Sequence, residues 1–113
     1  MFRASWSPAA GAVAWYSTTS VTPSASNVTI RNLTVAGATQ PSSTGVLVAN
    51  GSNVRIQSSL IHSINGWGVR TWNATGVTIQ DNEIAGTAIG VEFAYRSDGS
   101  RALNNRIHHN IIE

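Results

Sequence analysis

Short segments in which apolar and polar residues alternate recur along the chain, each built around a central isoleucine. In segments 28–35, 54–61 and 77–84 a valine opens the alternation, an isoleucine follows two residues later, and another aliphatic residue stands five positions beyond it. We align a fourth copy with residues 105–112, centred on Ile107. Alternation with a period of two predicts half-buried β-strands, because successive side chains of a strand point to opposite faces.

A second motif, Gly-Val, lies between the copies of the first. It begins at Gly45, Gly68 and Gly90, at nearly equal intervals, and the central isoleucines of the first motif follow a similar period. Strands this short cannot bury an apolar face singly, but stacked repeats can do so together. We therefore predict an all-β right-handed parallel β-helix, a solenoid of about four coils with three short strands in each.

The pattern Val-x-Ile-x-x-Asn-x-Ile followed by Gly-Val, across residues 27–113, resembles the repeats of the pectate-lyase-like β-helix superfamily. In that superfamily a tight turn after the second strand often carries stacked asparagines. The resemblance implies this position for Asn82 and Asn110, with Ser59 and Leu33 in the same slot of other copies. Asparagine tolerates left-handed backbone, and its amide can bond to neighbouring turns, so we interpret these side chains as structural.

The repeats also predict how the chain is organised. Residues 27–113 hold the coils, and the last copy stops directly after the tight turn. Residues 1–26 are either a partial coil, with 11–15 as a degenerate copy of the Gly-Val strand, or a leader segment. Because an exposed coil edge is a template for further pairing, we expect further coils of a longer parent chain, a second chain as a cap, or self-association.

Alternation along the Gly-Val strands assigns each residue to one face of the sheet. The inward pairs are Val46 and Val48, Val69 and Thr71, and Val91 and Phe93. The outward rows are Leu47, Arg70 and Glu92, and then Ala49, Trp72 and Ala94. Parallel stacking therefore puts Arg70 beside Glu92, with Trp72 on the same face.

A cation, a carboxylate and an aromatic ring on one face suit a sugar. The ring can stack on C–H groups, and the charged groups can bind hydroxyls or a uronate. The resemblance implies the same face, since superfamily members usually bind polysaccharide along this sheet. The candidate catalytic residues are Arg70, Glu92 and Tyr95. The candidate substrate-binding residues are Asn65, Trp67, Trp72, Arg96 and Asp98.

Structural interpretations of these residues stay open. Arg70 and Glu92 also fit a surface ion pair, the tryptophans fit packing under loops, and Arg96 and Asp98 fit a solvated loop tip. The outward row Thr29, Arg55, Thr78 and Arg106 interrupts threonine with cations, which argues against ice binding.

Composition narrows the function mainly by exclusion. Charged residues make up 11% of the chain, all seven cations other than histidine are arginine, and there is no cysteine. Disulfides, thiolate zinc sites and cysteine nucleophiles are therefore excluded. Scattered arginines predict no nucleic-acid partner, and no apolar run reaches the roughly 18 residues of a membrane span. We expect no metal and no cofactor, because the adjacent pair His108 and His109 is a weak metal signal.

The acidic residues decide how far an enzyme can be predicted. Glycoside hydrolysis usually needs two carboxylates facing one gap, and this chain has five acids in all, none placed opposite Glu92. The acid clusters of polygalacturonases and the calcium-holding acids of pectate lyases are missing. We expect a piece of a secreted polysaccharide-acting protein of lyase, glycoside hydrolase or epimerase type, extracellular or at the cell surface. The alternative is a non-catalytic carbohydrate-binding, adhesive or structural module.

Overall fold

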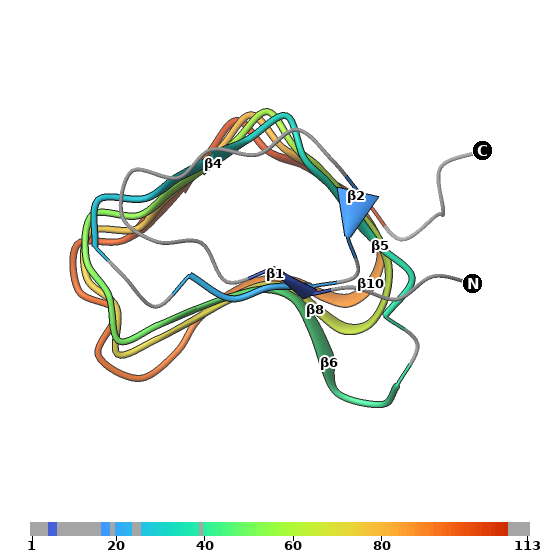
Figure 1. Cartoon of the computed structure of the whole chain (residues 1–113), viewed down its shortest axis with the longest axis horizontal. Coiled ribbons are helices and arrows are strands. Elements are labelled where there is room, and N and C mark those ends of the chain that lie inside the picture. Colours follow the sequence, from blue (N-terminus) through green and yellow to red (C-terminus); the bar gives the residue numbers. More distant parts are fainter. Residues whose placement is uncertain (1–4, 7–16, 19, 24–25, 39, 109–113) are drawn as a thin grey trace.

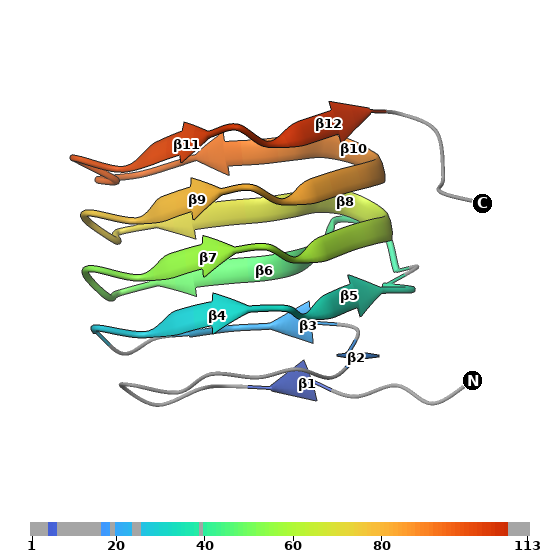
Figure 2. The same cartoon turned by 90° about the horizontal axis from the view of Figure 1, so that it is seen from above.

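The computed structural model describes residues 5–6, 17–18, 20–23, 26–38 and 40–108 of the chain. Every regular element in these residues is a strand, and every strand pairing is parallel (Figure 1). About four coils stack along one axis, as Figure 2 shows. The predicted all-β parallel solenoid is confirmed. None of the described residues forms a helix that could cross a membrane.

The strands form two sheets. The large sheet holds β1 (Ser5–Trp6), β3 (Ser20–Val21), β6 (Ser43–Ala49), β8 (Leu60–Trp72), β10 (Glu83–Phe93) and β12 (Arg106–His108) in that order, with β2 (Ser17–Thr18) paired to β5 (Thr34–Ala36) and β5 to β8. The small sheet runs in the order β11 (Arg101–Leu103), β9 (Thr78–Gln80), β7 (Arg55–Gln57) and β4 (Thr29–Arg31). The predicted extent of the repeats, 27–113, and the nature of residues 1–26 stay predictions, and the copy at 11–15 lies outside the described residues.

Two of the strands are longer than the sequence pattern predicts. β8 and β10 span 13 and 11 residues, and each joins the third short strand of its coil to the Gly-Val strand. The join contains a bulge: Ile64 pairs with Thr87 but Trp67 pairs with Ile89, so β8 has one extra residue there. A bulge leaves the extra residue unpaired and bends the strand, and the ladder of hydrogen bonds resumes beyond it.

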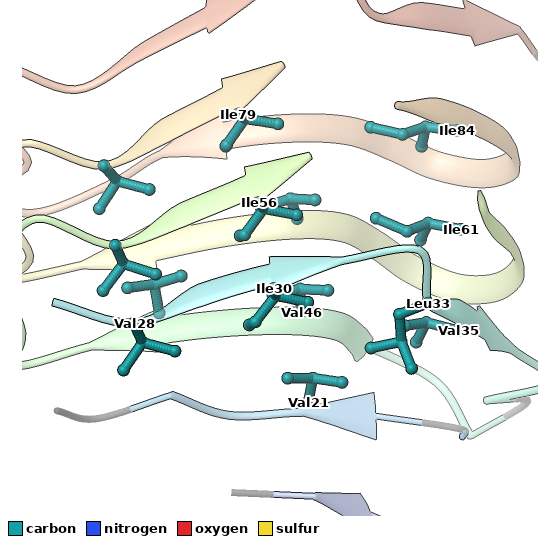
Figure 3. Packing of buried hydrophobic residues seen from close by; sticks show 14 of the residues in the cluster. Val21, Val28, Ile30, Leu33, Val35, Val46, Ile56, Ile61, Ile79 and Ile84 are labelled. Carbon is teal, nitrogen blue, oxygen red and sulfur yellow. The ribbon is translucent and has the colours of Figure 1, made fainter. Parts of the chain in front are cut away.

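The core consists of aliphatic columns to which each coil contributes the same positions. Figure 3 shows two of these columns, whose members are fully buried: Ile30, Ile56 and Ile79, and then Val35, Ile61 and Ile84. Neighbouring members lie about one strand spacing apart, roughly 4.8 Å. Burying each side chain contributes about 2 kcal/mol relative to exposure. Because neighbouring coils provide this burial, no coil is stable without its neighbours.

The fourth copy of the repeat is not where the sequence pattern placed it. Ile107 pairs with Ile84, and Ala102 takes the place above Ile79. The interval from Ile79 to Ala102 equals that from Ile56 to Ile79, so the longer interval implied by placing Ile107 in this column was wrong. The alignment had followed the larger side chain, whereas the backbone ladder follows the turns and accepts alanine in the column.

Two predicted rows change for the same reason. The outward row of the small sheet ends at Arg101, not at Arg106, which lies on β12 opposite Glu83. The slot in the tight turn is filled by Leu33, Ser59, Asn82 and Asn105. Asn110, which had been placed there, lies outside the described residues.

The asparagines of the tight turn form a ladder between coils. Asn82 is only 3% exposed; its Oδ1 accepts the Ser59 N–H at 3.0 Å, and its Nδ2 donates to Ile56 O at 3.1 Å. Asn105 repeats this one coil further on, accepting from Asn82 N at 3.1 Å and donating to Ile79 O at 2.9 Å. Because these bonds satisfy buried backbone groups, Asn82 has the structural role predicted for it.

The left-handed residue of each tight turn precedes this slot by one position. Those residues have φ between 52° and 56°, and they are Asn32, Ser58, Asp81 and Asn104. Short polar side chains tolerate this region because they can bond locally to the backbone. The tight turn therefore uses two different polar positions, one for backbone shape and one for the ladder.

The glycines of the Gly-Val motif are explained by close approach and not by backbone angle. A Cβ on Gly68 would lie 2.7 Å from Gly90 O and 2.7 Å from Ile84 Cγ2. Gly45 has the same relation to Gly68 O, at 2.8 Å. Any side chain there would push neighbouring coils apart. Glycine therefore lets each Gly-Val strand pack directly against the isoleucine of the next coil, Ile61 beside Gly45 and Ile84 beside Gly68.

The last Gly-Val strand is only half covered. Phe93 pairs with buried Thr71 but remains 40% exposed, and Val91 is partly exposed. Within the described residues, no strand pairs with the other edge of this part of β10. The predicted inward direction of these two residues therefore does not lead to full burial.

Candidate functional site

The candidate residues lie on the outer face of the large sheet, on the Gly-Val parts of β6, β8 and β10. Val69 and Thr71 of β8 are fully buried, which leaves Arg70 and Trp72 on the outer side. A Cβ on Gly68 would also point into the core, toward Ile84. Two consecutive inward positions shift the alternation by one residue, and so Trp67 lies on the same side as Arg70.

The Arg70 guanidinium lies between two indole rings. Its Cζ is 4.4 Å from the ring centroid of Trp67 and 5.5 Å from that of Trp72. Both distances are within the roughly 6 Å range of cation–π attraction. The two rings therefore hold the arginine over the sheet. Trp67 contributes the face of its ring. The indole N–H of Trp67 is buried without an acceptor among the described residues.

Glu92 on the next coil pairs with this arginine, as the spacing predicted. The two residues are in register, and Arg70 Nε lies 2.8 Å from Glu92 Oε1. The N–H is not directed at the oxygen, so the contact is an ion pair without an aligned hydrogen bond. The two side chains are 29% and 36% exposed, so water screens much of their attraction.

Tyr95 extends the aromatic array by one coil. Its ring centroid lies 5.2 Å from that of Trp72, with the planes tilted by 33°, and the Arg96 Cζ lies 5.1 Å from the Tyr95 ring. The sequence pattern had placed Ala94 in this row. The structure differs because Asn73 N donates to Tyr95 O just as Asn50 N donates to Trp72 O, which aligns Tyr95 with Trp72.

An open hollow of about 390 Å³ adjoins the array. Leu47, Ala49, Arg70 and Trp72 line it. Leu47 pairs with Arg70 and Ala49 with Trp72, so β6 supplies the apolar part of the wall. Both residues were predicted to face outward but were not recognised as part of the site. Their register with Arg70 and Trp72 could have identified them.

The coils that carry this site match a known protein-family model. The family model described as right handed beta helix region matches residues 15–112. The chain belongs to this β-helix family. Neither a curated protein nor a solved structure gave a match. The family match confirms the right-handed parallel β-helix that the repeats predicted.

The loop after β10 of the β-helix is held against the coil below it. Ser97 Oγ lies 2.6 Å from buried Thr71 Oγ1 and donates to Ala94 O at 2.7 Å. The backbone oxygen of Asp98 accepts the Gly76 N–H at 3.0 Å. These bonds hold the loop that carries Tyr95 against the neighbouring coil, so Tyr95 does not stand on a free loop tip.

Two of the predicted substrate-binding residues lie at the margins of the array. Asn65 is exposed in the bulge of β8, where its backbone N–H donates to Ala38 O at 2.8 Å. Asp98 is exposed in the loop and is fixed through its backbone. The other six candidates form one chain of contacts: Trp67, Arg70, Trp72, Glu92, Tyr95 and Arg96.

Among the described residues, the array of contacts in the β-helix contains one carboxylate, that of Glu92, while Asp98 lies at its margin. Glu83 pairs with His108 at 3.0 Å on another part of the large sheet, and Asp81 belongs to the tight turn. Within the described residues, no three His, Asp or Glu side chains gather as a metal-binding group. The arrangement offers aromatic faces and charged hydrogen-bonding groups, but not two carboxylates across a gap.

Proposed function

We propose that this β-helix binds a polysaccharide on the aromatic face, defined as Trp67, Arg70, Trp72, Glu92 and Tyr95 with the adjoining hollow. The observation that carries the proposal is the guanidinium held between two indole rings beside an open hollow. Binding without cleavage is the function that the geometry supports best. Cleavage by a lyase, hydrolase or epimerase is less well supported, because the face offers a single carboxylate already paired with Arg70.

The exposed rings supply the apolar part of the interaction. Trp72 is 45% exposed and Tyr95 is 50% exposed, and their rings lie side by side on successive coils. Exposed aromatic surface that is contiguous favours a partner that covers it. The C–H face of a sugar ring can cover an aromatic ring while its hydroxyls stay directed toward polar groups.

The charged pair supplies the polar part. Arg70 Nε lies beside Glu92 Oε1 without an aligned hydrogen bond, and the guanidinium carries further N–H donors. Glu92 can accept hydrogen bonds from hydroxyls, so the pair offers donors and acceptors a few ångströms apart. Neighbouring hydroxyls on one sugar ring present the complementary arrangement, and the rings of Trp67 and Trp72 restrict the arginine to one position.

The stacking of coils makes the face elongated. Leu47, Arg70 and Glu92 follow one another along the axis, as do Ala49, Trp72 and then Tyr95. A polymer of sugars can lie along such rows, whereas a single monosaccharide would cover only a part. Because such polymers are found outside cells, we propose an extracellular or cell-surface location.

Affinity electrophoresis in gels that contain soluble polysaccharides tests this proposal. Trp72→Ala removes the central ring, and we expect binding to weaken about tenfold, as loss of one stacked ring implies. Ile107→Ala is the matched control, since Ile107 is a similarly exposed apolar residue on β12, outside both the aromatic face and the small sheet. Equal retention of Trp72→Ala and the unchanged protein would refute the aromatic face.

Product analysis tests the absence of cleavage separately. The protein is incubated with uronate and neutral polysaccharides, and both unsaturated products and new reducing ends are measured. We expect neither. A product that disappears in Glu92→Gln would make the face catalytic and overturn the binding-only proposal.

A further inference from the structure

The small sheet has an outer face of its own with two stacked rows of polar side chains. One row consists of Thr29, Arg55, Thr78 and Arg101, and the second row, two residues further along each strand, consists of Arg31, Gln57, Gln80 and Leu103. Between the rows lies the column of buried Ile30, Ile56 and Ile79, which continues to the exposed Ala102. We call the three exposed cations Arg31, Arg55 and Arg101 the arginine face.

None of these three arginines has an ion-pair partner among the described residues. The two ion pairs there join Arg70 to Glu92 and His108 to Glu83, both on the large sheet. The two rows contain no acid. The carboxylate nearest in sequence to the second row, Asp81, accepts from Gln80 Nε2 at 3.4 Å, and Asp98 lies in the loop before β11.

The spacing of the arginines follows from the coil. Arg55 and Arg101 occupy the same row two coils apart, which separates their backbones by about 9.6 Å, twice the strand spacing. Arg31 lies one coil below Arg55 in the neighbouring row, at roughly 8 Å. Threonine and glutamine side chains lie between and beside the three cations, so hydroxyl and amide groups are available along the whole face.

We propose that the arginine face is a second binding site, for a linear anionic polysaccharide that carries carboxylate or sulfate groups. Guanidinium groups bind such anions through paired N–H donors, and the threonines and glutamines suit the hydroxyls between them. The polymer lies along the solenoid axis, with charged groups bound at intervals of one to two coils.

Other polyanions fit this face less well. Proteins bind single-stranded nucleic acid by stacking bases on aromatic rings, and the two rows contain none. A duplex is read by an element that enters a groove, which a flat sheet face cannot do. Stable anchoring to an anionic membrane takes a second signal besides surface charge, such as apolar side chains that insert, and Leu103 is the one large apolar member of the rows.

The arginine face is separate from the aromatic face. The small sheet and the Gly-Val part of the large sheet lie on opposite sides of the coil, so the outer faces of these two parts point away from each other (Figure 1). The proposal therefore does not rest on the proposed function, and one face can fail while the other holds.

Binding to dextran sulfate and to polygalacturonate, with neutral dextran as the reference polymer, tests the arginine face. We expect affinity for at least one of the two anionic glycans and none for dextran, and the comparison of the two tells sulfate from carboxylate. Arg55→Gln and Arg101→Gln should each weaken binding about threefold, and the double variant about tenfold, as expected for exposed charge contacts.

Arg106→Gln is the matched control. It removes one exposed charge from β12 of the large sheet, and circular dichroism confirms that each variant keeps its strands. Equal weakening by Arg106→Gln would mean that net charge and not the arginine face governs binding, which overturns the proposal. It is also overturned if neither anionic glycan binds, or if an oligonucleotide or anionic vesicles bind more tightly than both glycans.

Discussion

Replacing Asn82 by alanine removes a side chain that connects three successive coils. Its amide satisfies the Ser59 N–H and the Ile56 carbonyl of the coil below, and its Nδ2 also donates to Asn105 Oδ1 of the coil above at 3.0 Å. Ser59 is 6% exposed and Ile56 is fully buried, so water does not replace the lost bonds. Leaving a buried polar group unsatisfied costs about 1–3 kcal/mol, so two such groups imply roughly 2–6 kcal/mol.

That loss is a large share of the stability of a small domain, about 5–15 kcal/mol. Urea unfolding followed by far-ultraviolet circular dichroism measures it, with the slope of the transition as a check that the unfolded state is unchanged. Asn82→Asp should cost at least as much, because it keeps the acceptor but puts a charge opposite the oxygens of Ile56 and Asn105.

Asn53→Gly is the matched control from an exposed ladder. Asn53 Nδ2 donates to Asn27 Oδ1 at 2.7 Å in an exposed turn, and Gly76 and Gly99 follow Asn53 in the left-handed position of the next two coils. Glycine keeps the backbone angle, and the lost bond is replaced by water, so we expect a loss under about 1 kcal/mol. The reasoning is refuted if Asn82→Ala stays within about 1 kcal/mol of the unchanged protein, or if Asn53→Gly costs as much.

Four further substitutions test the packing and the ion pair. Gly68→Ala should destabilise by about 1–3 kcal/mol, because its Cβ would overlap a backbone oxygen of the next coil; unchanged urea unfolding would contradict the close approach. Ile56→Ala should cost about 2–5 kcal/mol, whereas Ile107→Ala, at a 51% exposed position, should cost under about 1 kcal/mol; equal losses would restore the rejected alignment of the two residues. Glu92→Gln should change stability by less than about 1 kcal/mol, since its pairing with Arg70 is partly exposed, and a thermal melt that shows a larger loss would indicate a buried pair.

The repeat interval predicted the part of the candidate site that depends only on the register of the strands. The interval between Gly68 and Gly90 placed Arg70 beside Glu92, and the structure confirms that placement. The contact of Trp67 with Arg70 could not be predicted, because it depends on two consecutive inward residues at the bend of β8. The sequence pattern placed Tyr95 in a loop. Its alignment with Trp72 could not be predicted, because it depends on the backbone bond that Asn73 N donates to Tyr95 O.

The fourth coil shows where repeat alignment fails. Ile107 matched the consensus by side-chain type, but Ala102 occupies that column, while the turn residue Asn105 stands one regular interval after Asn82. Turn residues were the better guide, because they determine where the backbone can reverse, whereas a column tolerates any apolar side chain small enough to fit.

By itself the sequence determined that this chain stacks short strands into a parallel solenoid, because alternation and repeat length are local properties that leave few ways to bury apolar residues. Tertiary structure alone decided which residue lies above which at each bend and bulge, and therefore which side chains share a face. The reason is that a one-residue bulge changes no local propensity, yet it turns every following side chain to the other side of the sheet.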